Sequence, residues 1–405
     1  MISRRQAILG ALATTGAAGA LTAVTGVAAA EAYKQGFTEA EQIAQTAVVK
    51  NQARWSGRHQ GGIEAPAQAH ANFIAYDIAE GITKDDMLRW MVLLTDDITR
   101  LCSGKPALAD PEPDLVLGAA NLTITVGFGP SLFKKLGLEA QLPEGFKQIP
   151  AFKIDQLKPE FSDGDVLIQA GADDLQILSH VTRTLMRDSQ SFGEVRWVQS
   201  GFTNAVGSTK PGTTQRNLMG QVDGTDNPEF GSDNFAKQVW IEAGPKWAIG
   251  GTTMLLRRIE MQLQTWDQLG RDQKEEVIGR HLDTGAPLGK KHERDAIDFD
   301  AKNENGMPLI APFAHVRRAS SQNLDERFFR RPFNYQIVDP ETNQLRAGLL
   351  WTAYGRDLHK QYVPVQKRLD EFDLLNKWTT PIGSALFAMP RGFKPGEILA
   401  EELFS

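Results

Sequence analysis

The chain has 405 residues and a formal net charge of −6, with 41% hydrophobic and 23% charged residues. This composition is typical of a globular protein and excludes a mainly disordered chain. The acidic balance makes non-specific nucleic-acid binding a poor hypothesis, because such binding needs clustered Lys and Arg. The single cysteine, Cys102, excludes intramolecular disulfides, structural zinc clusters and cysteine-held iron–sulfur clusters.

The first 30 residues have the pattern of an export signal. Ser3, Arg4 and Arg5 begin a charged segment, a weakly apolar run follows, and residues 27–30 provide a cleavage site of small side chains. Adjacent arginines at this position indicate the twin-arginine route, which exports folded proteins and favours a cofactor enzyme. A membrane anchor is the alternative for the same run. Beyond residue 30, no uncharged stretch is long enough to predict a membrane span.

The first half of the mature chain shows two strand–helix–strand units. Apolar residues at Met87, Trp90, Met91, Leu94 and Ile98 have helical spacing, whereas residues 122–128 alternate as a strand does. The predicted strands cover residues 71–77, 122–128 and 165–170, and the predicted helices cover residues 38–51, 83–101 and 175–186.

The second half repeats this pattern and so indicates an α+β fold. Strands are predicted over residues 252–259 and 349–354, and helices over residues 265–280 and 363–378. Residues 207–227, rich in Gly, Thr, Pro and Asn, form a plausible boundary between the halves. Residues 282–312 are polar and too long for a plain connector, which is typical of a functional or disordered loop.

His315 differs from the other six histidines because an apolar run, residues 311–314, leads into it and two arginines follow closely. The chain has no H-x-x-x-H pair, which argues against a helical zinc site. A single histidine in an apolar setting is the ligand pattern of a five-coordinate haem. A satisfied core histidine is the alternative, and spacing alone favours it.

Two further segments contain residues suited to chemistry. Asp223 lies between Gly220 and Gly224, so the backbone can turn sharply and another group can approach the carboxylate; a plain Asp-Gly turn is the alternative. Arg330 and Arg331 lie among aromatic residues, which predicts at least one guanidinium packed against apolar surface and bonded to an anion or another acceptor.

In this order, the three segments resemble the dye-decolourising peroxidase family over nearly the whole mature chain. Residues 216–225 are similar to the family's G-x-x-D-G segment, residues 314–317 to its proximal-histidine segment, and residues 330–335 to its distal-arginine segment. Pro332 stands where relatives often have Gly. The exported, twin-arginine branch of the family is the most similar.

The resemblance implies one haem b per chain and two ferredoxin-like halves, residues 31–215 and 216–405, with the haem mainly in the second. His315 would bind the iron with Asp373 behind it, and Asp223 and Arg330 would act over the open position. The residues expected around the cofactor are Asn227, Arg280, Arg317, Leu350 and Phe387, besides His315 and Asp373.

The implied function is a peroxidase that uses hydrogen peroxide to oxidise dyes, phenols or other organic donors through a ferryl intermediate, with an acidic pH optimum. Candidate residues for electron exit are Trp266, Trp351, Trp378 and Tyr335, with core packing as the alternative for each. Two other functions remain open: a deferrochelatase in iron uptake and a haem carrier without catalysis. Export predicts a periplasmic or secreted protein, and the family resemblance predicts a homo-oligomer.

Overall fold

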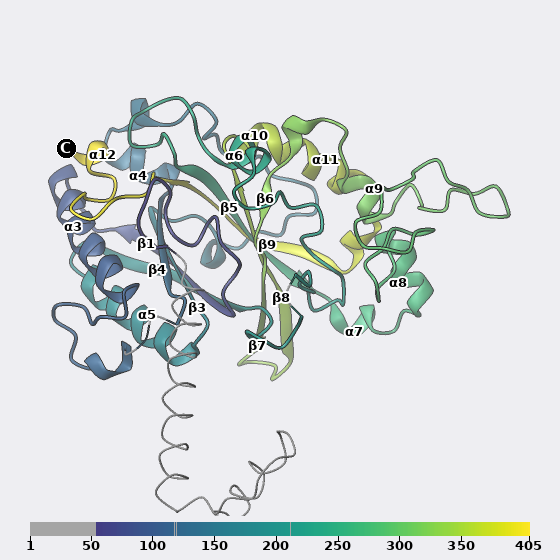
Figure 1. Ribbon diagram of the computed structural model, residues 1–405, viewed down its shortest axis with the longest axis horizontal. Helices are drawn as coiled ribbons and strands as arrows, with labels where there is room; N and C mark the ends of the chain where they lie inside the picture. Colours follow the sequence, from purple (N-terminus) through teal and green to yellow (C-terminus); the bar gives the residue numbers. More distant parts are fainter. Residues whose placement is uncertain (1–53, 117, 119, 211) are drawn as a thin grey trace, which may run out of the picture. The chain divides into compact units, whose positions relative to one another are not determined.

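The computed structural model describes residues 54–405 except 117, 119 and 211. The predicted export signal and the helix predicted over residues 38–51 lie outside the described residues. Figure 1 shows strands at the centre of the described chain and helices around them. None of the helices within the described residues is long and apolar enough to cross a membrane.

The described chain contains the following regular elements. The strands are β1 (His70–Ile78), β2 (Thr123–Phe128), β3 (Val166–Ala172), β4 (Gly193–Phe202), β5 (Thr252–Met261), β6 (Phe329–Arg330), β7 (Phe333–Val338), β8 (Leu345–Gly355) and β9 (Thr379–Met389). The α-helices are α3 (Lys84–Leu101), α4 (Pro130–Lys135), α5 (Leu175–Ser189), α6 (Asp233–Val239), α7 (Leu263–Trp266), α8 (Arg271–Ile278), α9 (His315–Ala319), α10 (Leu358–Gln361), α11 (Val363–Phe372) and α12 (Glu401–Phe404). The 3₁₀ helices are η1 (Pro113–Val116), η2 (Glu139–Gln141), η3 (Pro159–Phe161), η4 (Leu324–Glu326) and η5 (Leu374–Lys377).

The two halves of the chain have the same strand order. In the first half the order is β4-β1-β3-β2, and in the second it is β9-β5-β8-β7, with all neighbours antiparallel. In each half one helical segment follows the first strand and another follows the third. This is the topology of a ferredoxin-like fold, and it confirms the predicted α+β class with two similar halves.

The strands of both halves join into one sheet that closes on itself. Strand β2 meets β9 at Phe128 and Ala388, and β4 meets β7 at Phe202 and Asn334. The long pairing of β5 with β8 completes the ring. Each of the two strand ladders between the halves is therefore a single pair of residues, and a hydrophobic cluster with residues from both halves adds to them.

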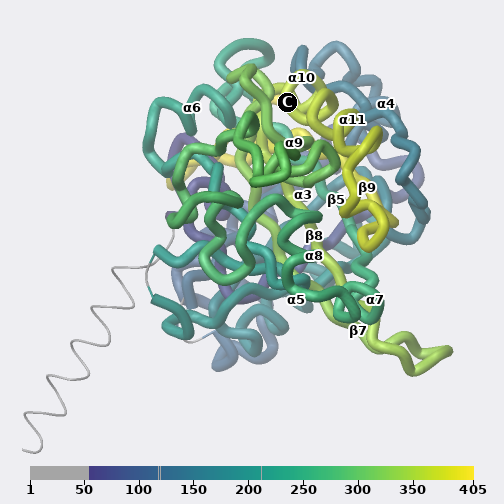
Figure 2. Tube along the Cα trace, turned by 90° about the vertical axis from the view of Figure 1, so that its right-hand side faces the viewer, coloured from purple at the N-terminus to yellow at the C-terminus, as the bar shows by residue number. Residues whose placement is uncertain are grey.

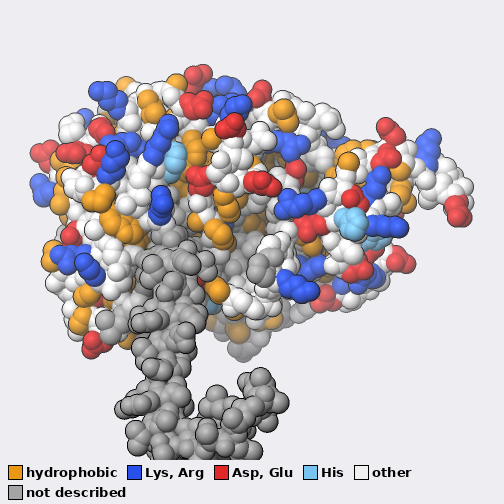
Figure 3. Space-filling model, in the orientation of Figure 1, with side chains coloured by type: hydrophobic (Ala, Val, Ile, Leu, Met, Phe, Trp, Pro, Cys, Tyr) orange, Lys and Arg blue, Asp and Glu red, His pale blue; other side chains and the backbone are white. Residues whose placement is uncertain are grey.

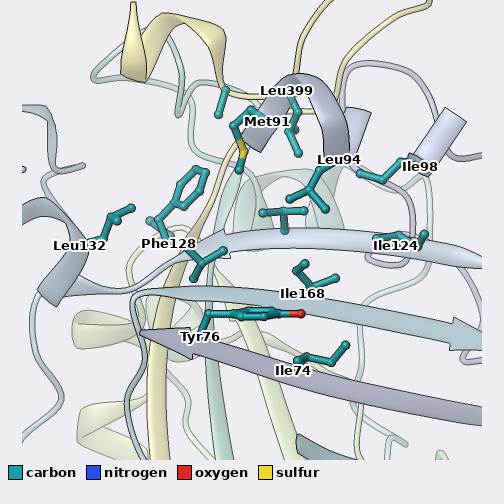
Figure 4. Packing of buried hydrophobic residues seen from close by; sticks show 14 of the residues in the cluster. Ile74, Tyr76, Met91, Leu94, Ile98, Ile124, Phe128, Leu132, Ile168 and Leu399 are labelled. Atoms are coloured by element: carbon teal, nitrogen blue, oxygen red, sulfur yellow. The ribbon is translucent and has the colours of Figure 1, made fainter. Parts of the chain in front are cut away.

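Helix α3 illustrates how local sequence and packing agree. Thr83 and Asp86 form a capping box that bonds the first free N–H groups of the helix. Along one face, Met91, Leu94 and Ile98 are buried against the sheet. Figure 4 shows these side chains pointing toward residues of β1, β2 and β3. Burying this apolar face is what holds the helix on the sheet.

Two predicted helices are shorter in the structure. The helix expected over residues 265–280 is divided into α7 and α8, because Gly270 starts a new helix whose first free N–H is bonded by the Gln273 side chain at 2.9 Å. The helix expected over residues 363–378 ends at Phe372. Asp373 has extended backbone angles and its side chain caps the short helix η5 that follows.

Candidate active site

His315 is the first residue of α9, which contacts both α8 and α11. Figure 1 shows α9 between these two helices, and Figure 2 shows it above α8. Its Nδ1 lies 2.6 Å from Oδ2 of Asp373, which follows the last residue of α11. A carboxylate at this distance accepts the Nδ1 proton, so the neutral ring keeps a lone pair on Nε2. Burial disfavours the imidazolium, but the charge of Asp373, its hydrogen bond to the ring and the charge of Asp223 together outweigh burial and raise the pKa of His315.

Asp223 and Arg330 form the second part of the site. Arg330 Nη1 lies 3.6 Å from Asp223 Oδ1, and neither side chain is fully exposed. Gly220 and Gly224, on either side of Asp223, have φ angles of +83° and +123°, which residues with a Cβ adopt rarely. The predicted sharp turn at Asp223 is therefore present. The charges of Asp223 and Arg330 both act on the His315 imidazole, so both groups lie in its neighbourhood.

Asn227 connects the two segments that carry this pair. Its Nδ2 donates to the main-chain oxygen of Arg330 at 2.7 Å, and its Oδ1 accepts from the main-chain N–H of Arg330 at 3.0 Å. The amide thus binds both polar groups of one peptide residue. The Asn227 side chain therefore contacts the main chain of Arg330 and fixes the position from which the arginine side chain extends.

Pro332 interrupts the strand that contains Arg330. Because proline has no N–H, the strand is divided into β6 and β7, while Arg331 still donates its main-chain N–H to Thr352 at 2.9 Å. The Pro332 oxygen accepts from Gln215 Nε2 at 2.9 Å, and the Gln215 oxygen accepts from the Asp223 N–H at 2.9 Å. Through Gln215, Pro332 is therefore bonded to the Asp223 segment.

Arg331 is the buried guanidinium that the sequence predicts. Only 3% of its surface is exposed, it donates to the carbonyl oxygens of Gly62 and Ala65, and it lies over the Phe329 ring. Burial lowers the pKa of Arg331 to about 10. The structure therefore confirms an arginine that meets neutral acceptors in an apolar environment.

The two arginines expected near the cofactor are half-buried and partly bonded. Arg280 Nη1 donates to the main-chain oxygens of Gly285 and Glu293 at 2.7 and 2.9 Å. Arg317 donates through Nε and Nη2 to main-chain oxygens, at 2.6 Å for Phe299. Burial lowers the pKa of Arg280 against the opposing charge of Glu293. Each guanidinium has N–H groups beyond those in these bonds, which remain available to an anion.

The two apolar residues expected to line the pocket, Leu350 and Phe387, are completely buried. Both belong to one hydrophobic cluster, which packs between strands of the second half and β1. Three of the other histidines bond to neighbouring groups, as expected for hydrogen-bonding histidines: His59 to the Gly250 oxygen, His180 to Asp110 and His281 to Glu275.

The donor set fits a haem. Within the described residues, no group of three or more His, Cys, Asp and Glu side chains is placed to hold a metal ion. A metal at His315 Nε2 therefore has to bring its other ligands with it, as a porphyrin-bound iron does. The His315 side chain keeps 32% of its surface accessible although Ala314 beside it is fully buried. A flat apolar group with anionic substituents suits this histidine and the nearby arginines.

Comparison with known proteins identifies the family. The model described as "Dyp-type peroxidase, N-terminal" matches residues 60–203, and "Dyp-type peroxidase, C-terminal" matches residues 214–394. The chain belongs to this family of haem peroxidases, and it is an oxidoreductase that acts with peroxide.

Relatives with 34–43% identity cover most of the chain. The chain is 35% identical over 416 residues to the dye-decolorizing peroxidase of Thermobifida fusca (strain YX). The matched region covers 97% of this chain and 96% of that protein. It is 34% identical over 354 residues to the deferrochelatase of Escherichia coli (strain K12), covering 82% and 83%. The crystal structure of a DyP-type peroxidase from Cellulomonas bogoriensis matches with a TM-score of 0.84 at 43% identity, covering 88% and 99%.

Sequence reasoning did not single out Gln215, Glu293 or the contact of Asn227 with the Arg330 main chain. Gln215 and Glu293 are polar residues in Gly- and Pro-rich loops, and their partners lie up to 117 residues away. The unusual length of the polar segment 282–312 is the one signal in the sequence that points toward Glu293.

Proposed function

We propose that the chain binds one haem b through His315 and uses hydrogen peroxide to oxidise dyes, phenols or other organic donors, most rapidly at acidic pH. The observation that carries this proposal is the arrangement around His315. Its Nδ1 is bonded to Asp373, and the charges of the Asp223–Arg330 pair act on its ring. An acid and a guanidinium opposite a ligand histidine are the groups that peroxide cleavage needs.

The proton transfer follows from Asp223 and Arg330. Haem, when bound, supplies an iron with an open position and the electrons for cleaving the peroxide O–O bond. The Asp223 carboxylate accepts the proton that one peroxide oxygen loses and returns it to the other oxygen, so that water leaves. The Arg330 guanidinium, 3.6 Å from Asp223 Oδ1, stabilises negative charge on the oxygens as they separate.

The remaining residues hold the cofactor or position the groups that act on peroxide. Asp373 keeps the proton on His315 Nδ1 and makes Nε2 a stronger ligand. Arg280 and Arg317 supply positive charge for the propionates, Leu350 and Phe387 supply apolar surface, and Asn227 holds the arginine segment in place.

Two variants test this assignment. His315→Ala is expected to lose the Soret absorbance of bound haem, whereas Asp223→Asn keeps it and slows the first reaction with peroxide by about 100-fold or more. Stopped-flow absorbance measures that rate. A His315→Ala protein with an unchanged spectrum contradicts the ligand assignment, and an unchanged rate in D223N contradicts the proton-transfer role.

Iron release from haem is a second candidate, supported by the 34% identity to a protein named deferrochelatase. The Asp223–Arg330 pair supports the peroxidase, and it also argues against a haem carrier, because storage needs no acid over the iron. Anaerobic incubation with haem and without peroxide separates the two activities. Recovery of metal-free porphyrin favours the deferrochelatase, and its absence alongside peroxide-dependent dye bleaching favours the peroxidase.

We also infer that residues 1–30 direct export by the twin-arginine route, to the periplasm or out of the cell, and that the halves meet near residues 215 and 216. Arg4 and Arg5 support the export route. Replacing both with Lys is expected to keep the protein in the cytoplasm on cell fractionation. A homo-oligomer is the expected assembly, and light scattering of the purified protein measures it.

A further inference from the structure

A carboxylate in the long loop between α8 and α9 is bonded to the segment that carries Asp223. Glu293 Oε1 accepts a hydrogen bond from Thr214 Oγ1 at 2.7 Å and another from Thr225 Oγ1 at 2.8 Å. The two threonines lie on either side of Asp223 in the sequence. One oxygen atom thus holds both ends of the turn that contains the proposed acid.

The main chain around Glu293 packs closely against the same turn. Arg280 binds the Glu293 oxygen and the Gly285 oxygen. At Gly285, a Cβ would lie 2.9 Å from Val222 Cγ2 and 3.2 Å from Glu293 Cγ, and the residue has a φ of +70°. Figure 3 shows acidic, basic and histidine side chains mixed on the surface over α8 and α9. The Glu293 carboxylate, in contrast, is bonded to two hydroxyl groups of the Asp223 segment.

Few other contacts fix Asp223. Its N–H bonds to the Gln215 oxygen at 2.9 Å, but its carboxylate lies 3.6 Å from Arg330, which is longer than a hydrogen bond. Gly220, before it, has no atom within 4 Å of the position of a Cβ. The bridge between Arg216 and Val222 holds the main chain before Asp223, and the bond of the Asn227 N–H to the Gly224 oxygen holds it after Asp223. Glu293 is the residue that joins the two ends. A carboxyl oxygen has two lone pairs and accepts both hydroxyl bonds, so Glu293 is suited to this task.

We propose that Glu293 is a positioning residue that fixes Asp223 beside Arg330 through Thr214 and Thr225. The inference rests on the proposed role of Asp223 in proton transfer. Glu293 does not touch the reacting groups, and it acts through the geometry of the turn. A misplacement of about 1 Å at a reacting group costs up to about 100-fold in rate, so loss of the two bonds has a measurable effect.

The substitutions separate geometry from charge. E293Q keeps an Oε1 that accepts both hydroxyl bonds and removes only the charge, whereas E293A removes the acceptor. T225V removes one hydroxyl and keeps the shape of the side chain. E304A, an exposed carboxylate in the same loop, is the matched control.

The first measurement is hydrogen exchange in the haem-loaded protein, followed by mass spectrometry of peptides that cover residues 214–227. We expect E293A to exchange about tenfold faster there, and E293Q and E304A to match the wild type. The second is the rate of the first reaction with peroxide, which E293A lowers by about 10- to 100-fold and E293Q restores to nearly the wild-type rate. In a D223N background, E293A adds no further decrease, because the two act in one path.

Wild-type exchange and rate in E293A overturn the proposal, as does an E293Q rate as low as that of E293A. If E293A does not accumulate as a folded haem protein, T225V decides in its place: faster exchange and a lower rate support the proposal, and wild-type values overturn it. A slow D223N with a fast E293A removes the role of Glu293 and leaves the proposed function intact. A fast D223N overturns the role of Asp223 and, with it, this inference.

Discussion

His315 Nδ1 and Asp373 Oδ2 lie 2.6 Å apart, and the other oxygen of Asp373 accepts from the main-chain N–H of Leu375 at 2.9 Å. Both oxygens of this carboxylate are therefore engaged, and its side chain is almost completely buried. The orientation of the imidazole is fixed by a residue 58 positions away, in the turn that ends α11.

Asp373→Asn tests the charge of this contact. The amide oxygen still accepts the Nδ1 proton, but the histidine becomes less basic, so we expect haem to remain bound and the reaction with peroxide to slow by about 10- to 100-fold. The reduction potential of the iron should rise as well. Glu371→Gln, an exposed carboxylate that pairs with Arg318, is the control. Unchanged potential and rate in D373N would show that the carboxylate charge plays no part.

Asn227→Ala tests the positioning of Arg330. The variant loses both bonds to the arginine main chain, so the guanidinium should shift and the rate of the peroxide reaction should fall by about tenfold. Haem content should stay at the wild-type level, because the residue is not expected to hold the iron. If loss of haem accompanies the lower rate, Asn227 serves the cofactor directly and this explanation fails.

Asp97 gives the stability of the first half a pH dependence. This carboxylate is 1% exposed with Oδ2 unpaired, and burial, with the charge of Asp188, raises its pKa to about 7. The folded chain therefore holds a proton that the unfolded chain releases near pH 4, so stability falls as pH rises from about 4 to about 7. Asp97→Asn should remove this dependence on pH. At pH 8 it should raise the free energy of unfolding by at most roughly 4 kcal/mol.

Thermal unfolding at pH 4 and pH 8 measures the effect of Asp97→Asn. The variant should unfold at a higher temperature than the wild type at pH 8 and at a similar temperature at pH 4. Asp85→Asn, an exposed carboxylate on the same helix, should leave the pH dependence unchanged. Equal shifts of D97N at both pH values would rule out titration of Asp97 as the cause.

Among the candidates for electron exit, Trp378 and Trp266 lie ring to ring. Trp378 is half-buried and lies 5.4 Å from the buried Trp266, whose indole N–H donates to the Met219 oxygen at 3.1 Å in the segment before Asp223. Tyr335, in contrast, lies under the Arg258 guanidinium, 4.0 Å from the ring centre, and a cation there opposes loss of an electron.

Trp378→Phe should therefore lower turnover of a bulky dye several-fold and leave turnover of a small phenol unchanged. Steady-state rates with both donors check this. Trp240→Phe, a buried tryptophan stacked on His59, is the control for loss of an indole. An equal decrease for both donors in W378F would mean that the substitution disturbs the haem site rather than an electron path.

Helices and strands whose signals lie close together along the chain could be predicted from the sequence. Helix α3 combines a cap at Thr83 with apolar residues at helical spacing, and its bounds agree closely with the prediction. Strands β4, β6, β7 and β9 were not predicted. In β9 most residues from Pro381 to Met389 are buried on both faces, and in β4 the exposed Val195 and Val198 break the alternation, so neither shows the pattern of a half-buried strand.

The site, too, has residues that the sequence indicates and contacts that it does not. His315, Asp223 and Arg330 lie in short segments whose composition is unusual, and the family resemblance named their roles and that of Asp373. The amide of Asn227 on the Arg330 main chain, and the carboxylate of Glu293 on Thr214, join residues 103 and 79 positions apart. Such contacts depend on how the halves and loops pack, and no local pattern in the sequence encodes them.

The two strand ladders that join the halves bear on how the chain can be cut. Expressed alone, residues 216–405 would lack the strands that meet β7 and β9, and both outer edges of the fragment would carry unpaired backbone groups. Neither fragment is then a suitable starting point for a minimal enzyme. When the two halves are mixed, by contrast, β9 can pair with β2 and β7 with β4. Reconstitution from two separately expressed halves is therefore the engineering route that suits this closed sheet.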